Sequence, residues 1–332
     1  MDDTVYKALL VEKNEDDQFI RTITERKVSD LPAGEVLVRV GYSSLNYKDA
    51  LSASGNRGVT RRYPHTPGID AAGVVVESDS AKFLPGEQVI VSCYDLGMNT
   101  PGGFGQYIRV PAAWVMKLPA GLSLQESMIY GTGGFTAAHS VWRLVEYGIT
   151  PEQGKILVTG ATGGVGSFSV AILAKLGYTV TAVSGKDSAH DFLRELGAVE
   201  VIGRAQAIDT SGRMVLKGRW AGVVDTVGGA MLATAIRSTR YGGAVTCCGN
   251  VAEPEFLINV YPFILRGVSL FGIDSAQCPM ALREKIWALL AAEWKIDNLG
   301  HLGTEITMDQ LDTYLARMLK GGIMGRIVVN MS

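Results

Sequence analysis

Cysteine is scarce in this chain, and its few members lack the spacing of a metal or disulfide framework. The 332 residues include four cysteines, Cys93, Cys247, Cys248 and Cys278, with no CxxC pair among them. A secreted disulfide scaffold and a zinc site built from four thiolates are therefore disfavoured. The spacing predicts free thiols in a reducing cytoplasm.

Long apolar runs and a strong charge of one sign are also missing. No uncharged apolar stretch reaches the ~18 residues that a membrane helix needs. The opening MDDTVYKALLV is acidic and then short and strand-like, unlike a secretory signal. Basic and acidic residues number 31 and 33, for a net charge of -2. We therefore expect a cytoplasmic protein with neither nucleic acid nor membrane as a partner.

The pattern of apolar residues changes along the chain and indicates two domains. The first ~120 residues read as short β-runs between turn signals, such as VYKALLVEK and GEQVIVSCYDLG. Ser123 and Glu126 resemble a capping box that opens a helix. From Lys155, short apolar strands alternate with helices, as in a parallel doubly wound sheet. We predict an α/β protein in which a Rossmann domain, residues 125–274, is inserted into a mostly β domain, residues 1–124 completed by 275–332.

A glycine-rich turn follows the first strand of the predicted Rossmann domain. The segment VTGATGGVG carries Gly160, Gly163, Gly164 and Gly166 between a strand and a helix. Glycines there permit a sharp turn and a close approach of pyrophosphate to the backbone, at the N-terminus of the helix. The turn predicts dinucleotide binding.

The end of the next strand distinguishes the two nicotinamide cofactors. An NAD site places a carboxylate about 20 residues past the glycines, to hold the ribose 2′-hydroxyl. Here the corresponding residues are Ser184, Gly185 and Lys186. Lys186 and Arg204, which follows the third strand, are cations suited to a 2′-phosphate. The sequence favours NADPH over NADH.

A polar cluster, YSSLNYKDAL, follows a β-run near residue 42. Asn46, Tyr47, Lys48 and Asp49 stand side by side and can donate, accept or carry a proton. They can equally be the polar start of a helix, with Lys48 and Asp49 as a helix-start charge pair. Both interpretations stay open at this point.

Several of these motifs together resemble one protein family over essentially the whole chain. SSLNYKDAL, YPHTPGIDAAGVV, GTGGFTAAHSV and VTGATGGVG resemble the zinc-independent branch of the medium-chain dehydrogenase/reductase superfamily that includes quinone oxidoreductases and acryloyl-CoA reductases, the YhdH/YhfP group. The resemblance implies a GroES-like β domain, a Rossmann domain, an active cleft between them, NADPH as reductant and a homodimer. It also implies the following cofactor contacts: Tyr47, Thr136, Thr162, Gly163, Gly164, Val165, Ser184, Gly185, Lys186, Arg204, Asn250, Ile264, Ser275 and Arg326.

The zinc ligands of the metal-using relatives have no counterpart at the matching positions. The resemblance implies that those relatives place a cysteine near Asn46 and Tyr47, and a His-Glu pair in the segment where this chain has Gly68, Ile69 and Asp70. A catalytic zinc needs three protein ligands, which a lone Asp70 does not supply. We therefore predict that no metal is bound.

Reduction of an electron-poor C=C or a quinone suits such a site, because it needs only hydrogen-bond donors and a proton source. We expect an NADPH-dependent reductase of small molecules, either enoyl thioesters like acryloyl-CoA or enones. Tyr47, assisted by Lys48 or Asn46, is the candidate proton donor, with water as the alternative. Quinone reduction is the enzymatic alternative, and a non-catalytic NADP(H) sensor is the alternative from another class.

Three arginines, Arg57, Arg61 and Arg62, lie in the segment SGNRGVTRRYPH. They either hold the phosphates of a CoA thioester or form a solvated basic loop. The sequence does not decide between these two interpretations.

Overall fold

The computed structural model describes residues 4–332, which form two compact units. Unit 1 contains the chain up to Thr132 together with Ala276–Ala292 and Asp297–Ser332, and unit 2 contains Gly133–Ser275 and Glu293–Ile296. Residues 125–132, which we expected in the Rossmann domain, thus group with unit 1. The helix α2 (Leu124–Tyr147) runs through the boundary and is broken at Gly131.

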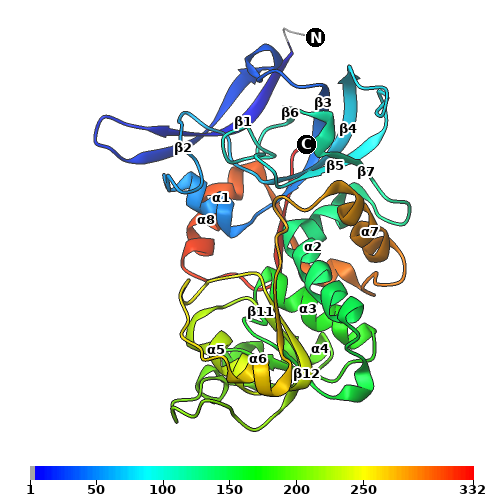
Figure 1. Ribbon diagram of the computed structural model, residues 1–332. Helices are drawn as coiled ribbons and strands as arrows, with labels where there is room; N and C mark the ends of the chain where they lie inside the picture. The colour runs from blue at the N-terminus through cyan, green and yellow to red at the C-terminus, as the bar shows by residue number, and fades with distance from the viewer. Residues whose placement is uncertain (1–3) are drawn as a thin grey trace. The chain divides into compact units, whose positions relative to one another are not determined.

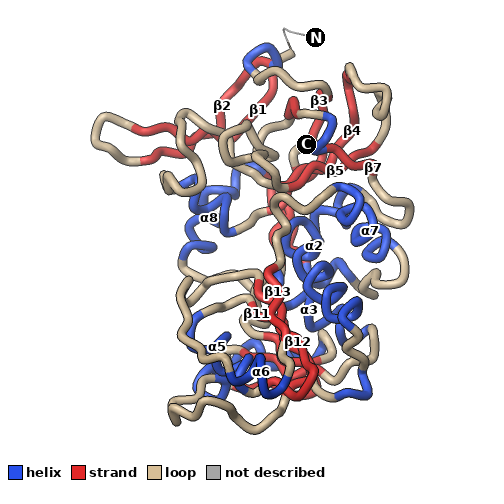
Figure 2. Tube along the Cα trace, viewed as in Figure 1, coloured by secondary structure: helices blue, strands red, loops and turns tan. Residues whose placement is uncertain are grey.

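Unit 1 consists largely of strands joined by loops and turns (Figure 2). Its seven-stranded sheet has the order β14-β15-β3-β4-β5-β7, with β6 paired to β3, and β1 and β2 form a separate antiparallel pair. The bounds are β1 Val5–Lys13, β2 Phe19–Lys27, β3 Val36–Ser44, β4 Asp70–Ser78, β5 Gln88–Ser92, β6 Tyr107–Val110, β7 Val115–Lys117, β14 Gly303–Thr307, β15 Arg326–Asn330, α1 Tyr47–Ala53, α7 Met280–Ala291 and α8 Leu311–Leu319.

The chain's tail is part of the sheet in unit 1. Strand β15 pairs antiparallel with β3, and Val328 lies opposite Ser44. The C-terminal segment thus lies beside a strand of the first 124 residues. The core of unit 1 follows the two-residue period of β3, whose Val36, Val38 and Val40 are buried.

Unit 2 is a six-stranded parallel sheet with the order β10-β9-β8-β11-β12-β13. This order is that of a doubly wound dinucleotide-binding fold, and it confirms the predicted fold class. In Figure 1, α3 and α4 lie on one side of β11 and β12, and α5 and α6 lie on the other. The bounds are β8 Ile156–Val158, α3 Gly164–Lys175, β9 Val180–Val183, α4 His190–Glu195, β10 Ala198–Ile202, β11 Trp220–Asp225, α5 Gly229–Arg237, β12 Thr239–Cys247, α6 Tyr261–Arg266 and β13 Ser269–Gly272.

Two helices of unit 2 are followed by glycines with positive φ. Gly177 follows α3 and Gly197 follows α4, with φ of 82° and 99°, a conformation that glycine adopts without steric cost. The predicted capping box at the start of α2 is also present, because Ser123 and Glu126 exchange side chain-to-backbone hydrogen bonds of 2.8 and 3.1 Å. Within residues 4–332, no helix is both long and apolar enough to cross a membrane.

Candidate active site

Three strands of unit 1 bring polar side chains together at one end of the sheet. Ser44 is the last residue of β3, and Asp70 is the first residue of β4, which runs antiparallel beside β3. Arg326 is the first residue of β15, on the other side of β3. Because all three lie at adjacent strand ends, their side chains meet in the interior.

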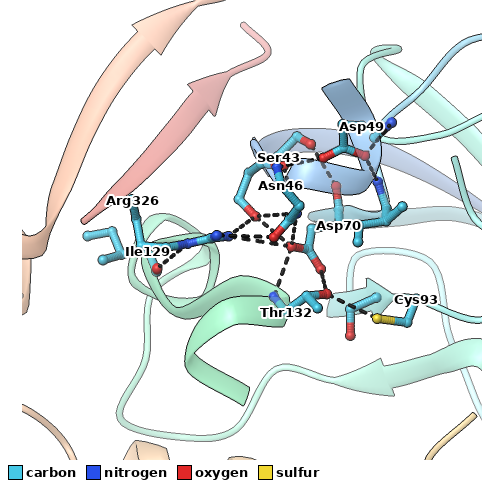
Figure 3. A network of polar contacts seen from close by, with 12 residues as sticks. Ser43, Asn46, Asp49, Asp70, Cys93, Ile129, Thr132 and Arg326 are labelled. Carbon is cyan, nitrogen blue, oxygen red and sulfur yellow. Dashed lines mark hydrogen bonds and ion pairs between the residues drawn. The ribbon is translucent and has the colours of Figure 1, made fainter. Parts of the chain in front are cut away.

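Asp70 is fully buried and is the centre of a hydrogen-bond network (Figure 3). Its Oδ2 accepts hydrogen bonds from the hydroxyl of Ser44 at 2.6 Å and from the amide of Asn46 at 2.8 Å. Thr132 donates twice, through its backbone N–H to Oδ2 at 2.9 Å and through its hydroxyl to Oδ1 at 2.7 Å. The carboxylate therefore has four donors, which offsets the cost of burying its charge.

The break in helix α2 makes one of these donors available. Gly131 has φ 49° and ψ -157°, which interrupts the helical hydrogen bonding so that the N–H of Thr132 faces Asp70. A Cβ at Gly131 would lie 2.5–2.8 Å from atoms of Ser44, Arg326 and Asp70. Glycine is thus required here for two reasons, its backbone conformation and the closeness of the network.

Arg326 supplies a buried cation to the same network. Its guanidinium donates to Asn46 Oδ1 at 3.0 Å, to Ser44 Oγ at 2.7 Å and to the carbonyl of Ile129 at 3.3 Å. Its Nη2 lies 3.7 Å from Asp70 Oδ2. Burial lowers the pKa of Arg326, and the negative charge of Asp70 opposes this effect. The guanidinium of arginine keeps its proton in proteins, so the network contains a buried cation.

The segment Asn46–Asp49 divides between the interior and the surface. Asn46 is 8% exposed and belongs to the network, whereas Tyr47, at the start of α1, is 55% exposed. Asp49 is buried and accepts backbone N–H bonds from Asn46 at 2.7 Å and from Ile69 at 2.8 Å. The helix-start interpretation is thus confirmed, because Asn46 is the N-cap residue of α1 and Asp49 lies in its first turn. Asp49 is buried, however, and its partners are backbone N–H groups rather than Lys48.

The pKa of Asp49 is raised to about 7, mainly because burial disfavours its charged form. The nearby charge of Asp70 raises it further, and the backbone hydrogen bonds oppose the shift. Cys93 lies next in the network, with its sulfur 3.1 Å from the hydroxyl of Thr132. Burial and Asp70 raise the pKa of this thiol to about 11, so it is not a thiolate nucleophile at neutral pH.

The predicted dinucleotide turn in unit 2 has the geometry that phosphate binding requires. It lies between β8 and α3, at the position where the strand order reverses between β8 and β11. A Cβ at Gly166 would lie 2.3 Å from the carbonyl oxygen of Gly160, so helix and turn pack more closely than any other residue allows. This cradle fits a pyrophosphate at the N-terminus of α3.

The residues predicted to choose the cofactor lie together at the end of β9. The hydroxyl of Ser184 accepts the backbone N–H of Lys186 at 3.0 Å and fixes this short loop. The guanidinium of Arg204 lies against Gly185, 2.6 Å from where a Cβ would stand. Ser184, Gly185 and Lys186 thus form one short loop with Arg204 against it, and contact of these residues with a 2′-phosphate stays a prediction.

The other predicted cofactor contacts are dispersed within unit 2. Thr136 is buried in α2, Asn250 lies exposed after β12, and Ser275 follows β13. Ile264 lies in α6 and is 68% exposed. For all of these, as for Tyr47 and Arg326, cofactor contact stays a prediction.

Sequence reasoning missed several members of the network. It gave no role to Ser44, Gly131 or Thr132, and it considered Asp70 only as a metal ligand. It also missed Asp225 at the end of β11, which is buried and accepts the hydroxyl of Thr159 at 2.7 Å. The available signals were a carboxylate at the first residue of a strand and a glycine inside a helix. Among the described residues, no three His, Cys, Asp or Glu side chains are placed to hold a metal ion.

The doubly wound sheet with its glycine cradle defines unit 2 as the dinucleotide-binding part of an oxidoreductase. Residues 32–120 match the family described as alcohol dehydrogenase GroES-like domain, and residues 164–292 match the family described as zinc-binding dehydrogenase. The chain is similar to YhfP of Bacillus subtilis, named a putative quinone oxidoreductase, with 44% identity over 99% of each chain.

Two further relatives match over nearly their whole length. The acrylyl-CoA reductase AcuI of Ruegeria pomeroyi is 41% identical over 99% of this chain and 100% of its own. The structure of the yhdH oxidoreductase from Salmonella enterica, solved in complex with NADP, is 40% identical, covers 98% of this chain and 100% of its own, and has a TM-score of 0.95. The chain belongs to the medium-chain dehydrogenase/reductase family, in the group formed by YhfP, YhdH and AcuI.

Proposed function

We propose that this oxidoreductase reduces a C=C bond conjugated to a carbonyl, with short enoyl-CoA thioesters of the acryloyl-CoA kind as its substrates and NADPH as reductant. The observation that carries the proposal is the 41% identity to an acrylyl-CoA reductase over the whole chain. When bound, NADPH would supply the hydride that adds to the β-carbon.

Hydride addition leaves an enolate, and the chain's own residues would stabilise it. Asn46 and Arg326 form a buried pair joined at 3.0 Å, so an amide and a guanidinium cation are held together in this part of unit 1. A preorganised cation and amide of this kind stabilise a developing oxyanion without reorganising during the reaction. We assign this role to the pair, with Asp70 holding both side chains in place.

Tyr47 is our candidate for the proton donor. Its phenol is exposed at the start of α1, next to Lys48, which in the described part of the chain forms no ion pair with a carboxylate. An accessible phenol beside a cation is a suitable proton source. If water delivers the proton instead, Tyr47→Phe leaves kcat/KM unchanged.

Ser184, Lys186 and Arg204 support the choice of NADPH. Ser184 and Lys186 follow β9, Arg204 lies against Gly185 between them, and no carboxylate precedes Asp187 in this segment to hold a free ribose hydroxyl. Solved relatives carry NADP in one case and NAD in another. Measuring KM for both cofactors tests the assignment, and a clear preference for NADH contradicts it.

Quinone reduction is the second candidate, favoured by the 44% identity to the putative quinone oxidoreductase YhfP. The test is NADPH oxidation, followed by absorbance, with acryloyl-CoA, crotonyl-CoA, an enone, a benzoquinone and a naphthoquinone. Turnover of acryloyl-CoA far above that of the quinones supports the C=C reductase. The reverse order assigns the protein to quinones, and binding of NADPH without turnover of any acceptor contradicts both activities.

We further propose a cytoplasmic homodimer. The four cysteines are free, as suits a reducing compartment. Strand β13 is an edge of its sheet, and exposed apolar side chains gather in and just before α6, including Leu257 and Leu265. Edge strands and apolar patches mark association surfaces. Sedimentation of wild type and Leu265→Glu tests the dimer, while cell fractionation tests the location.

A further inference from the structure

A loop of unit 1 between α1 and the turn at Tyr63 presents three arginines to solvent. Arg57, Arg61 and Arg62 are all exposed, and within residues 4–332 none of them forms an ion pair with a carboxylate. The sequence left open whether such a loop binds phosphate or is merely solvated. Its structure gives grounds to decide.

The loop is tightly held from beneath. Val59 and Thr60 are buried, and the hydroxyl of Thr60 lies 2.7 Å from that of Ser52 on α1. The carbonyl of Asn56 accepts the N–H groups of both residues at 3.0 Å. The phenol of Tyr63 donates to the carbonyl of Ser52 at 2.7 Å. Arginines on such a fixed base lose less conformational entropy on binding than arginines on a flexible loop.

The charge of the loop is largely uncompensated. Lys13 lowers the pKa of Asp17 through a hydrogen bond and its charge, and Arg57 adds only a smaller effect. Asp17 has its ion pair with Lys13, at 2.5 Å. Arg61 uses its backbone N–H, not its guanidinium, to bond Asn99. Two guanidinium groups, those of Arg61 and Arg62, thus stay available for a ligand anion.

We propose that this arginine loop binds the phosphate groups of the CoA moiety of the substrate. The inference rests on the proposed reduction of enoyl-CoA thioesters. Guanidinium groups match phosphate oxygens in a bidentate way. The loop follows α1, whose seven residues span about 10 Å from Tyr47. A CoA thioester separates its reactive acyl group from its phosphates by a long pantetheine arm, which suits an anchor one helix length away.

The test compares two thioesters that share the acryloyl group. Acryloyl-CoA carries the phosphates, and the acryloyl thioester of N-acetylcysteamine lacks them. In the double variant Arg61→Gln and Arg62→Gln, we expect KM for acryloyl-CoA to rise about tenfold, as for the loss of two exposed charge contacts. Its kcat and the kcat/KM for the short thioester stay as in wild type. The rise in KM shrinks at high salt, where exposed charges are screened.

Arg39→Gln is the matched control, because Arg39 is an exposed arginine of the same unit on β3. We expect this variant to keep the wild-type KM for both thioesters. Acryloyl-3′-dephospho-CoA identifies which phosphate is bound: a wild-type KM near that of acryloyl-CoA assigns the pyrophosphate, and a raised KM assigns the 3′-phosphate. Equal KM for acryloyl-CoA in wild type and double variant overturns the loop proposal. Failure of wild type to reduce either thioester overturns the proposed function instead.

Discussion

Replacing Arg326 by methionine removes a buried cation from unit 1 and keeps an apolar stem of similar length. Arg326 is 4% exposed, and its guanidinium donates to Asn46, Ser44 and Ile129. Removing one partner of a buried ion pair costs about 3–5 kcal/mol. Asp70 keeps its four other donors in this variant, so we place the loss at the lower end, about 3 kcal/mol of unfolding free energy.

The complementary variant Asp70→Asn is expected to be worse. It leaves the charge of Arg326 buried without its carboxylate. The NH₂ group of the new asparagine also faces groups that are hydrogen-bond donors to Asp70 in the wild type. We expect a loss of about 4 kcal/mol. In the double variant the two losses overlap, so its destabilisation falls short of the sum by about 2 kcal/mol.

Urea unfolding followed by tryptophan fluorescence measures the four proteins of this cycle. A common m-value allows the shifts in midpoint to be read as free energies. Arg39→Met is the matched control, because Arg39 is exposed on β3, and it should change stability by less than about 0.5 kcal/mol. A loss below about 1 kcal/mol for Arg326→Met, or strictly additive losses in the cycle, refutes the coupled network.

Three further outcomes follow from the same contacts. Gly131→Ala places a Cβ 2.5–2.8 Å from three network side chains, so we expect its free energy of unfolding in urea to fall by more than about 3 kcal/mol. The control Gly148→Ala lies at another positive φ with open space around it, and its free energy of unfolding should fall by only about 1 kcal/mol. Folding raises the pKa of Asp49 to about 7, so the folded state holds this proton more tightly than the unfolded state. The contribution of Asp49 to stability therefore falls as pH rises from about 4 to 7. The difference in Tm between wild type and Asp49→Asn should vary across that window, and a constant difference contradicts the shift. Arg204→Gln should raise KM for NADPH about tenfold and leave KM for NADH unchanged, and an equal rise for both refutes 2′-phosphate recognition.

The elements that the sequence predicted are those with a buried apolar face. Strands β8, β9 and β11 are buried along their whole length and read as continuous apolar runs. Strand β2 was not predicted, because FIRTITERK has no fully buried residue and only Phe19 and Ile23 pack partly against the core. Strand β14, GTEIT, was not predicted for the same reason, because it is short and mostly exposed. Where no face is buried, no periodicity is imposed on the sequence.

Four adjacent polar residues, Asn46 to Asp49, suggested a shared catalytic surface. Helix geometry separates them, because successive side chains of a helix point about 100° apart. Asn46, just before α1, and Asp49, in its first turn, face inward, while Tyr47 faces solvent. Adjacency in sequence therefore predicted the location of the site but not which side chains act together.

The partner of Asn46 is Arg326, 280 positions further along the chain, and no local pattern indicates that pair. Pairing of β15 with β3 creates it, which only the assembled sheet reveals.

The same pairing brings the guanidinium of Arg326 close to the carboxylate of Asp70. Its oxygens accept four hydrogen bonds, about as many as a carboxylate has lone-pair sites, and an arginine cation lies 3.7 Å away. A cation entering this position would have to displace a donor and approach Arg326 against like-charge repulsion. Asp70 thus holds Asn46 and Arg326 in place, which is the role that the proposed reduction needs.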